Sequence, residues 1–176
     1  MEDQAQRAKE LFATYYGSFL DMHREGKLAE YKSFNVTRET EIEWFTEMID
    51  RHIRELSIRN WEAVTSLSSI AKNYQDNLMV EKVVSFAARN ISSADSIVKL
   101  MFAEGMMEII RSNKGVITKE LLFKASKVTI EILEEVISQT LVIDPGHELE
   151  QYQLKDKRAI NQRAKQNIEA VMDIIN

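Results

Sequence analysis

The sequence predicts an all-α protein. Only five glycines and one proline occur among its 176 residues, whereas a chain built from strands needs frequent turns and carries more of both. Apolar residues make up 44% of the chain and recur at steps of three and four, the spacing that collects them on one face of a helix. A chain of this length suffices for one domain with a buried core. We expect a body of six helices followed by one amphipathic helix.

The first three expected helices each carry one apolar row. The first runs from about Asp3 to Glu25 and stops before Gly26, a residue that suits a helix C-terminus. The second begins at Thr37 or at Thr40, the latter together with the glutamate that completes a capping box, and the third begins at the cap Asn60. Their rows are Leu11, Phe12, Tyr15, Phe19 and Met22, then Ile42, Phe45, Ile49, Ile53 and Leu56, then Val64, Leu67, Ala71 and Tyr74.

The next three expected helices are richer in apolar residues. The fourth begins at Asp76, the fifth runs from a cap at Ser92 or Ser93 to about Arg111, and the sixth follows the cap Thr118. The fifth is apolar almost all round, which predicts a central position in the body.

The tripeptide Asp144-Pro145-Gly146 interrupts this pattern. Aspartate as the cap and proline at the first helical position are a usual helix opening, so we expect a last helix from about His147 to Ile175. That helix is polar and charged, with a narrow apolar seam formed by Ile160, Ala164, Ile168, Val171 and Ile175. The sequence therefore predicts a helical body over residues 1–143 and an amphipathic C-terminal helix within residues 144–176.

Composition excludes several classes of function. The net charge of −5 and the pI near 5.4 argue against a nucleic-acid partner, because phosphate backbones need a positive surface. The absence of cysteine excludes disulfides, thiolate metal sites and a cysteine nucleophile. The first residues lack the pattern of a secretory leader, and no stretch reaches the roughly 18 uncharged apolar residues of a membrane span. We therefore expect a cytoplasmic protein with no membrane partner.

Two patterns could supply metal ligands. His52 and Glu55 lie one helical turn apart, but the other two histidines, His23 and His147, are not placed to complete a zinc site. Glu47 and Asp50 form an ExxD pair that could hold magnesium against phosphates. Such a site needs a second acidic set on a facing helix, and Glu131, Glu134 and Glu135 offer one.

These acidic residues are also what the solvent face of a helix carries. We therefore expect no metal, no cofactor and no catalytic residue. The alternative is an all-α metal-dependent nucleotide hydrolase that uses Glu43, Glu47, Asp50 and Glu134.

The apolar interior gives a more specific indication. Four methionines and two phenylalanines lie side by side on the fourth and fifth expected helices, namely Met79, Phe86, Met101, Phe102, Met106 and Met107. Methionine adapts its shape and recurs where an apolar pocket must fit a flexible ligand. Ordinary core filling is the competing interpretation of the same pattern.

The stretch Ser92-Ser-Ala-Asp-Ser-Ile-Val-Lys-Leu-Met-Phe, followed by Glu104-Gly-Met-Met-Glu-Ile-Ile, together with the helix order, resembles a group of globin-like domains. These are the haem-free sensor domains of bacterial sporulation histidine kinases and stressosome regulators. The resemblance covers about Asp3 to Ile143. It implies a globin-like bundle, a small apolar ligand such as a fatty acid, a homodimer, and a histidine kinase or other signalling protein as partner.

In that group the helix from about Asn77 to Asn90 would stand where a globin carries its proximal histidine. This helix contains no histidine, so haem ligation at that position is excluded. The sequence hypothesis is therefore a regulatory domain, not an enzyme, that acts through a dimer or partner interface. A helical adaptor that docks its C-terminal helix without any ligand is a further alternative. The residues expected to line the ligand site are Val64, Leu67, Met79, Val83, Phe86, Val98, Met101, Phe102 and Met106.

Overall fold

The computed structural model describes all residues from 1 to 176, and it confirms the all-α prediction: it contains nine α-helices, two short 3-10 helices and no strand. The α-helices are α1 (Glu2–Thr14), α2 (Phe19–Arg24), α3 (Leu28–Ser33), α4 (Arg38–Arg54), α5 (Glu62–Ala71), α6 (Asn77–Asn90), α7 (Ser96–Asn113), α8 (Lys119–Ser138) and α9 (Lys157–Ile175). The 3-10 helices are η1 (Ile91–Ser93) and η2 (Leu149–Tyr152).

The expected helix from Asp3 to Glu25 is wrong as a single element. Tyr16 and Gly17 have φ angles of 51° and 73°, and two successive left-handed residues end an α-helix. Gly17 also has no room for a side chain, because a Cβ there would lie 2.3 Å from the ring of Phe45. The hydroxyl of Ser18 then accepts from the amide of Asp21 and caps α2. The stretch expected as a polar connection forms α3, so the body has more helices than the six predicted.

The helix caps decide between the alternatives left open above. Thr37, not Thr40, caps α4, and Asp76 and Thr118 cap α6 and α8 as expected. The cap expected at Ser92 or Ser93 is wrong, because both residues lie within η1. The carboxylate of Asp95 caps α7 instead, two residues later.

The last helix begins ten residues later than expected. Asp144-Pro145-Gly146 forms a turn, and the chain continues through η2 before α9 starts at Lys157. Gln153 ends η2 with a φ of 60°, and Asp156 caps α9 by accepting from the amide of Ala159. The connecting segment, residues 139–156, lies against the ring of Trp61, whose centroid is 5.3 Å from that of His147 and 5.3 Å from that of Tyr152.

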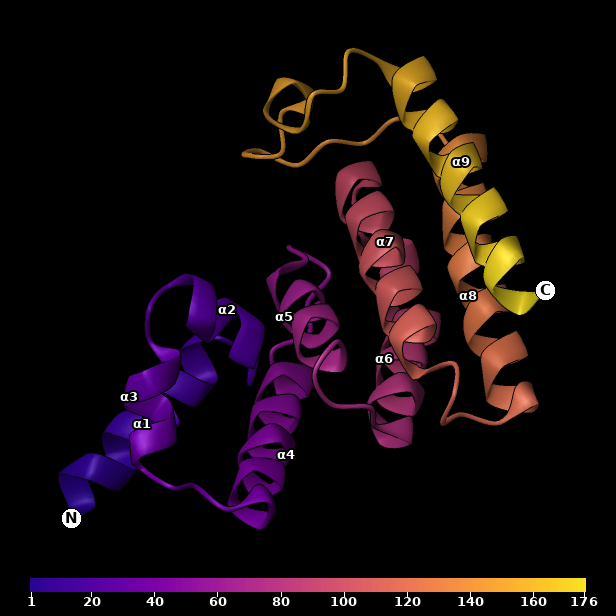
Figure 1. Ribbon diagram of the computed structural model, residues 1–176. Coiled ribbons are helices and arrows are strands. Elements are labelled where there is room, and N and C mark those ends of the chain that lie inside the picture. The colour runs from indigo at the N-terminus through magenta and orange to yellow at the C-terminus, as the bar shows by residue number, and fades with distance from the viewer.

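Helix α7 has the central position that its composition predicts. It packs against α5, α6, α8 and α9, while α8 and α9 lie along each other beside it (Figure 1). The N-terminal helices α1 and α3 lie at the other end of the molecule, where α4 connects them to α5 and α6 (Figure 1). Thirty-six buried apolar residues, from Ala8 in α1 to Ile174 in α9, form one continuous core.

Helix α9 belongs to this core. Its expected seam is largely confirmed, because Ile160, Ala164 and Val171 are buried and Ile168 is partly buried. Ile174 takes the last buried position in place of Ile175. None of the helices combines the length and the apolar composition that crossing a membrane demands.

Candidate functional site

The nine predicted site residues lie on three helices of the core. Helix α5 supplies two of them, α6 supplies three and α7 supplies four, and α7 packs against both of the other helices. Seven of the nine side chains are buried, and those of Phe86 and Met101 are partly buried. We call the nine residues the α5–α7 cluster.

Close contacts shape the α5–α7 cluster. The rings of Phe86 and Phe102 stack with their centroids 5.8 Å apart. Gly105 brings α7 close to α5, because a Cβ there would lie 3.0 Å from both methyl carbons of Val64. None of the nine residues lines the hollow along α9, the two hollows beside Trp44, the hollow between α1, α2 and α5, or the hollow between α6 and α8. The helices that carry the nine residues therefore pack on α7, and both the common site and the ligand space among them stay predictions.

Met101 connects the cluster to α9. The guanidinium of Arg163 donates to both carboxylate oxygens of Glu104, at 2.7 and 2.6 Å, and its Nη2 lies 3.7 Å from the sulfur of Met101. The amide of Asn167 donates to the same carboxylate at 2.6 Å. The hydrogen bond to Glu104 raises the pKa of Arg163, so this guanidinium stays charged. The sequence analysis missed this contact, because it joins residues about sixty positions apart.

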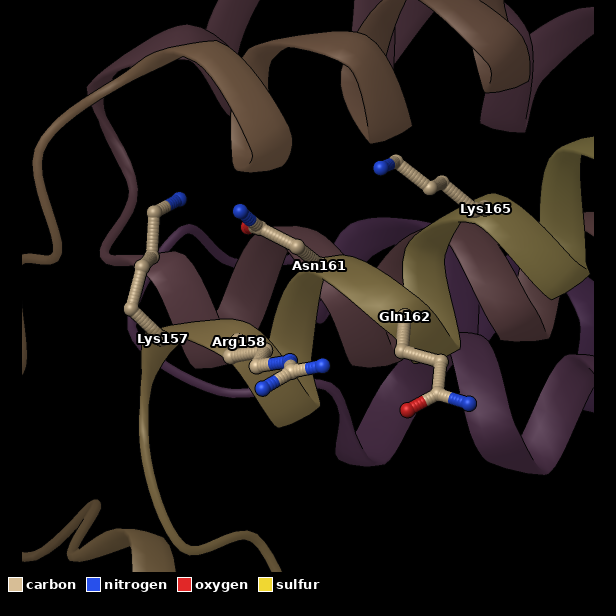
Figure 2. Close-up of a pocket in the computed structure, with 5 residues that line it drawn as sticks. All are labelled: Lys157, Arg158, Asn161, Gln162 and Lys165. Atoms are coloured by element: carbon tan, nitrogen blue, oxygen red, sulfur yellow. The ribbon is translucent and has the colours of Figure 1, made fainter.

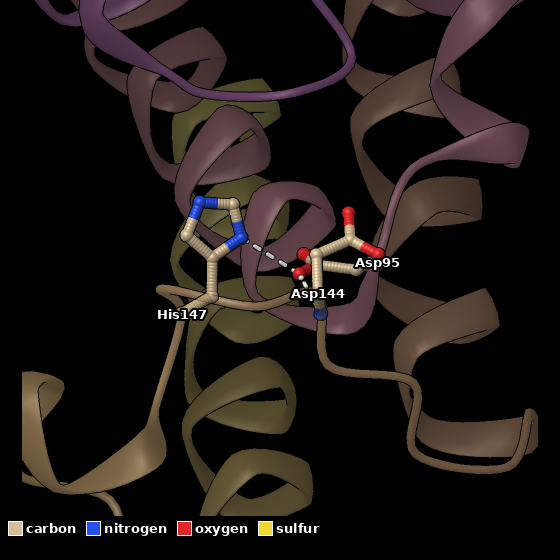
Figure 3. A group of neighbouring side chains, drawn as sticks. All are labelled: Asp95, Asp144 and His147. Atoms are coloured by element: carbon tan, nitrogen blue, oxygen red, sulfur yellow. Dashed lines mark hydrogen bonds and ion pairs between the residues drawn. The ribbon is translucent and has the colours of Figure 1, made fainter.

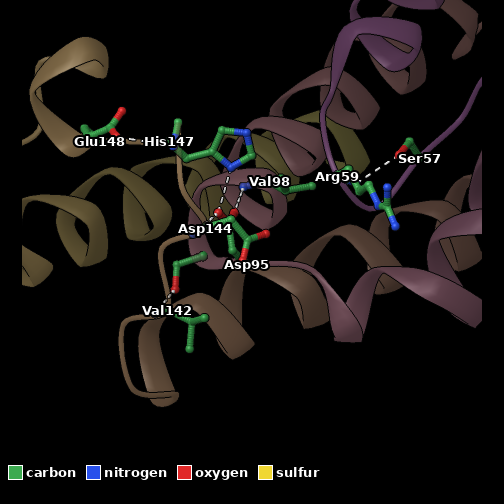
Figure 4. Close-up of polar contacts among 10 residues, drawn as sticks. Ser57, Arg59, Asp95, Val98, Val142, Asp144, His147 and Glu148 are labelled. Atoms are coloured by element: carbon green, nitrogen blue, oxygen red, sulfur yellow. Dashed lines mark hydrogen bonds and ion pairs between the residues drawn. The ribbon is translucent and has the colours of Figure 1, made fainter.

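The buried carboxylate of Asp95 joins α7 to the connecting segment (Figures 3 and 4). One oxygen accepts from the amide of Val98 at 2.7 Å, and the other contacts the amide of Asp144 at 2.9 Å and Nδ1 of His147 at 2.7 Å. Its side chain is fully shielded from solvent. The neighbouring Ser96 adds two bonds to the backbone of Val142, at 2.8 and 3.0 Å.

Asp95, Asp144 and His147 are also close enough to offer three ligand atoms to one metal ion, since these atoms lie within 4.8 Å of one another. Both oxygens of Asp95, however, already accept hydrogen bonds from the chain. The geometry therefore fits a tether that fixes the connecting segment. The sequence analysis missed this tether, because it assigned His147 to a helix. The available signal was Asp95, since an aspartate at this position suits a helix cap.

The structure does not bring together the acidic residues of the nucleotide-hydrolase alternative. Helix α4, which carries Glu43, Glu47 and Asp50, packs on α1, α5 and α6, whereas α8, which carries Glu134, packs on α6, α7 and α9. Figure 1 shows α4 and α8 on opposite sides of α6 and α7. Glu47 pairs with Lys9 at 2.6 Å. No facing acidic pair is formed by these residues.

The histidine pattern on α4 gives a local contact. Nδ1 of His52 lies 3.3 Å from the carboxylate of Glu55, which is half-exposed. His52 itself is buried, and burial lowers its pKa despite the nearby carboxylate. The neutral imidazole therefore belongs to the packing between α4 and Tyr16, whose ring centroid is 6.4 Å away.

A polar hollow of about 510 Å³ follows the first turns of α9 (Figure 2). It is lined by Lys157, Arg158, Asn161, Gln162 and Lys165. Lys157 also reaches across to α8, where its ammonium donates to the carbonyl of Val136, and burial lowers its pKa. The residues that line this hollow lie on the exposed face of α9, and the opposite face of α9 packs in the core.

No protein-family model, no curated protein and no solved structure matches this chain. The case for a function therefore rests on the residues and contacts described above.

Proposed function

We propose that this protein is a cytoplasmic regulatory domain, not an enzyme, that binds a small apolar molecule within the α5–α7 cluster. In this proposal the helices have a globin-like arrangement and no haem is involved. The ligand would be a molecule such as a fatty acid. The observation that carries the proposal is the double role of Met101, which lies in the apolar cluster and also contacts Arg163 on α9.

The chemistry of the cluster supports a ligand that the protein adapts to. Met79, Met101 and Met106 have unbranched, flexible side chains that can change rotamer without leaving an apolar environment. Phe86 and Met101 are partly exposed, so the cluster reaches the surface at two of its members. A ligand would enter there and move the methionines aside.

The contact with α9 supports a regulatory role. If a ligand displaces Met101, the sulfur moves relative to the guanidinium of Arg163. Glu104 holds this guanidinium through charge-assisted hydrogen bonds, and Glu104 itself accepts a hydrogen bond from Asn167. The ligand then favours one arrangement of α9 to the extent that it binds that arrangement more tightly. The proposed readers of this change are a second copy of the chain and a histidine kinase or other signalling protein.

Native mass spectrometry of the protein purified from cells, followed by lipid extraction, tests the ligand. We expect a bound apolar molecule, a higher melting temperature with laurate, and slower amide exchange in α5, α6 and α7. Protein without any bound molecule, together with an unchanged melting temperature and unchanged exchange, would contradict the proposal.

A pair of variants tests the route to α9. Arg163→Gln removes the contact with Glu104, whereas Arg158→Gln changes an exposed cation on the same helix. We expect both variants to bind laurate, but only Arg163→Gln to lose the ligand-dependent change in amide exchange of α9. An equal response of α9 in both variants would show that Arg163 does not transmit the change.

A further inference from the structure

Helices α1 and α4 leave two hollows between them, one on each side of Trp44. The first is about 300 Å³ in volume, and the second is about 220 Å³. The lining residues advance from Gln4 to Ala13 along α1 and from Thr40 to Arg51 along α4, so the hollows follow each other along the same two helices. We call them together the Trp44 seam. At 1.5 Å of rise per residue the seam is about 14 Å long.

The two ends of the Trp44 seam differ in chemistry. The first hollow is mainly apolar, with Ala5, Ala8, Phe34 and Val36 beside the indole of Trp44. The second has an apolar floor and a charged rim formed by Lys9, Glu47 and Arg51. The rim thus offers two cations, each of which has one carboxylate close to it.

The cations of the rim remain accessible to a ligand. Lys9 and Glu47 form an ion pair at 2.6 Å, but their side chains are 44% and 59% exposed. Arg51 lies 3.4 Å from Glu55, with 65% and 52% of the two side chains exposed. Exposed pairs of this kind contribute little, about 0–1 kcal/mol. An anion bound in the second hollow would therefore compete with these carboxylates at small cost.

The indole of Trp44 is fixed from the core side. Its ring centroid lies 5.4 Å from that of Phe12, which itself packs edge-on against Phe45 at 4.7 Å. Trp44 lines both hollows, and Phe12 lines the second one beside it. Such a rigid aromatic wall suits an apolar chain that lies along it.

We propose that the Trp44 seam binds a small amphipathic anion, with its alkyl chain against Trp44 and Phe34 and its acidic end near Lys9 and Arg51. The site uses α1, α4 and the segment between α3 and α4, and it shares no residue with the α5–α7 cluster. It is thus a second binding site, and its test does not depend on the function proposed above.

Fluorescence of Trp44 tests the proposal. Trp61→Phe leaves Trp44 as the single tryptophan of the chain and keeps an aromatic ring against His147 and Tyr152. We expect a saturable change of this fluorescence with laurate below its micellar concentration. Dodecanol, which has the same chain without the charge, should bind about two- to fivefold more weakly, as an exposed ion pair would give.

Matched variants in the Trp61→Phe background locate the site. Ala5→Leu fills the apolar hollow and should abolish the change, while Ala29→Leu, at an exposed position of α3 outside the hollows, should not. Arg51→Gln should remove the preference for laurate over dodecanol, whereas Arg54→Gln should keep it. Circular dichroism of each variant checks that the fold is retained.

Three results would overturn the proposal. The first is no saturable change, and the second is the same change in the Ala5→Leu and Ala29→Leu variants. In the second case, slower amide exchange confined to α5, α6 and α7 would assign the ligand to the α5–α7 cluster instead. The third is a lower molar mass in solution for Ala5→Leu than for Ala29→Leu, which would mean that a second copy of the chain occupies the seam.

Discussion

Tyr31 and Glu41 form a hydrogen bond of 2.6 Å inside the N-terminal part of the core, and both side chains are buried. Burial, together with the bond to the carboxylate, raises the pKa of Tyr31, so its hydroxyl remains a donor at any physiological pH. Arg38 lies 3.4 Å from the same carboxylate. This buried carboxylate is therefore compensated, which is the condition for burying a charge without a large loss of stability.

His52 should make stability depend on pH. Its pKa is lowered from 6.5, first by burial, so the unfolded chain binds a proton more readily than the folded protein. Stability is then highest above about pH 6.5 and decreases as the pH falls below that value. Urea unfolding between pH 8 and pH 5 measures this decrease.

The matched variants for this prediction are His52→Gln and His23→Gln. His23 is exposed, so its replacement should leave the pH dependence as in the parent protein. His52→Gln should flatten the decrease between pH 7 and pH 5. If the stability curves of both variants run parallel to that of the parent, the prediction about His52 is wrong.

At the scale of the elements, Asp95 should matter more than an ordinary helix cap. Asp95→Ala removes the cap of α7 and leaves the amides of Val98 and Asp144 without a partner. Loss of the cap, which includes the bond from Val98, costs about 1 kcal/mol, and loss of the part-buried hydrogen bond from Asp144 to this charged group adds about 1.5–3 kcal/mol. We expect a loss of about 2–4 kcal/mol in the free energy of unfolding, measured in urea.

Asp156→Ala is the matched control, because Asp156 caps α9 at an exposed position. Its loss should cost only about 1 kcal/mol. Amide exchange should also become faster over residues 142–148 in Asp95→Ala and stay unchanged there in Asp156→Ala. Equal losses of stability in the two variants, without faster exchange in that segment, would show that Asp95 is a simple cap.

Local patterns predicted the elements whose limits are set by neighbouring residues. The caps at Asp76 and Thr118 and the central position of α7 follow from the residues within a few positions. The break after α1 does not follow from neighbouring residues. Tyr16 adopts its left-handed conformation within the tertiary structure, where Asn73, 57 positions away, donates to its carbonyl at 2.9 Å.

The same distinction between local and long-range contacts applies to the start of α9 and to the candidate site. The bond between Asp95 and His147 holds the connecting segment outside a helix, and no pattern near Pro145 could indicate it. Helical periodicity was enough to predict apolar faces on which seven of the nine cluster residues are buried. The contact of Met101 with Arg163 was not predictable, because helical spacing does not specify which neighbouring helix a surface residue meets.

At the scale of the whole molecule, one core includes both the helical body and the C-terminal helix, which the sequence analysis treated as separate parts. Ile160, Ala164, Val171 and Ile174 of α9 belong to the same buried cluster as Leu133 and Val136 of α8. The connecting segment is held at one end by Asp95 and against Trp61. One continuous core of this kind favours cooperative unfolding of the entire chain.

We therefore expect the chain shortened after Ile143 to lose its fixed tertiary structure. The deletion removes the three large buried side chains of α9, Ile160, Val171 and Ile174. Each contributes about 1.5–3 kcal/mol by burial, against a total of about 5–15 kcal/mol for a typical domain. The shortened chain should bind a hydrophobic dye and unfold without a sharp transition, as a loosely packed helical state does.

A variant of the full chain separates the loss of packing from the loss of length. Ile160→Asp places a charge against α8 and should weaken the transition as the deletion does, whereas Met172→Asp, at a side chain 51% exposed, should leave it sharp. If the shortened chain unfolds in one sharp transition with the stability of the parent, residues 1–143 form an independent domain. Helix α9 would then be an appendage, and its contact with Met101 could not report on the core.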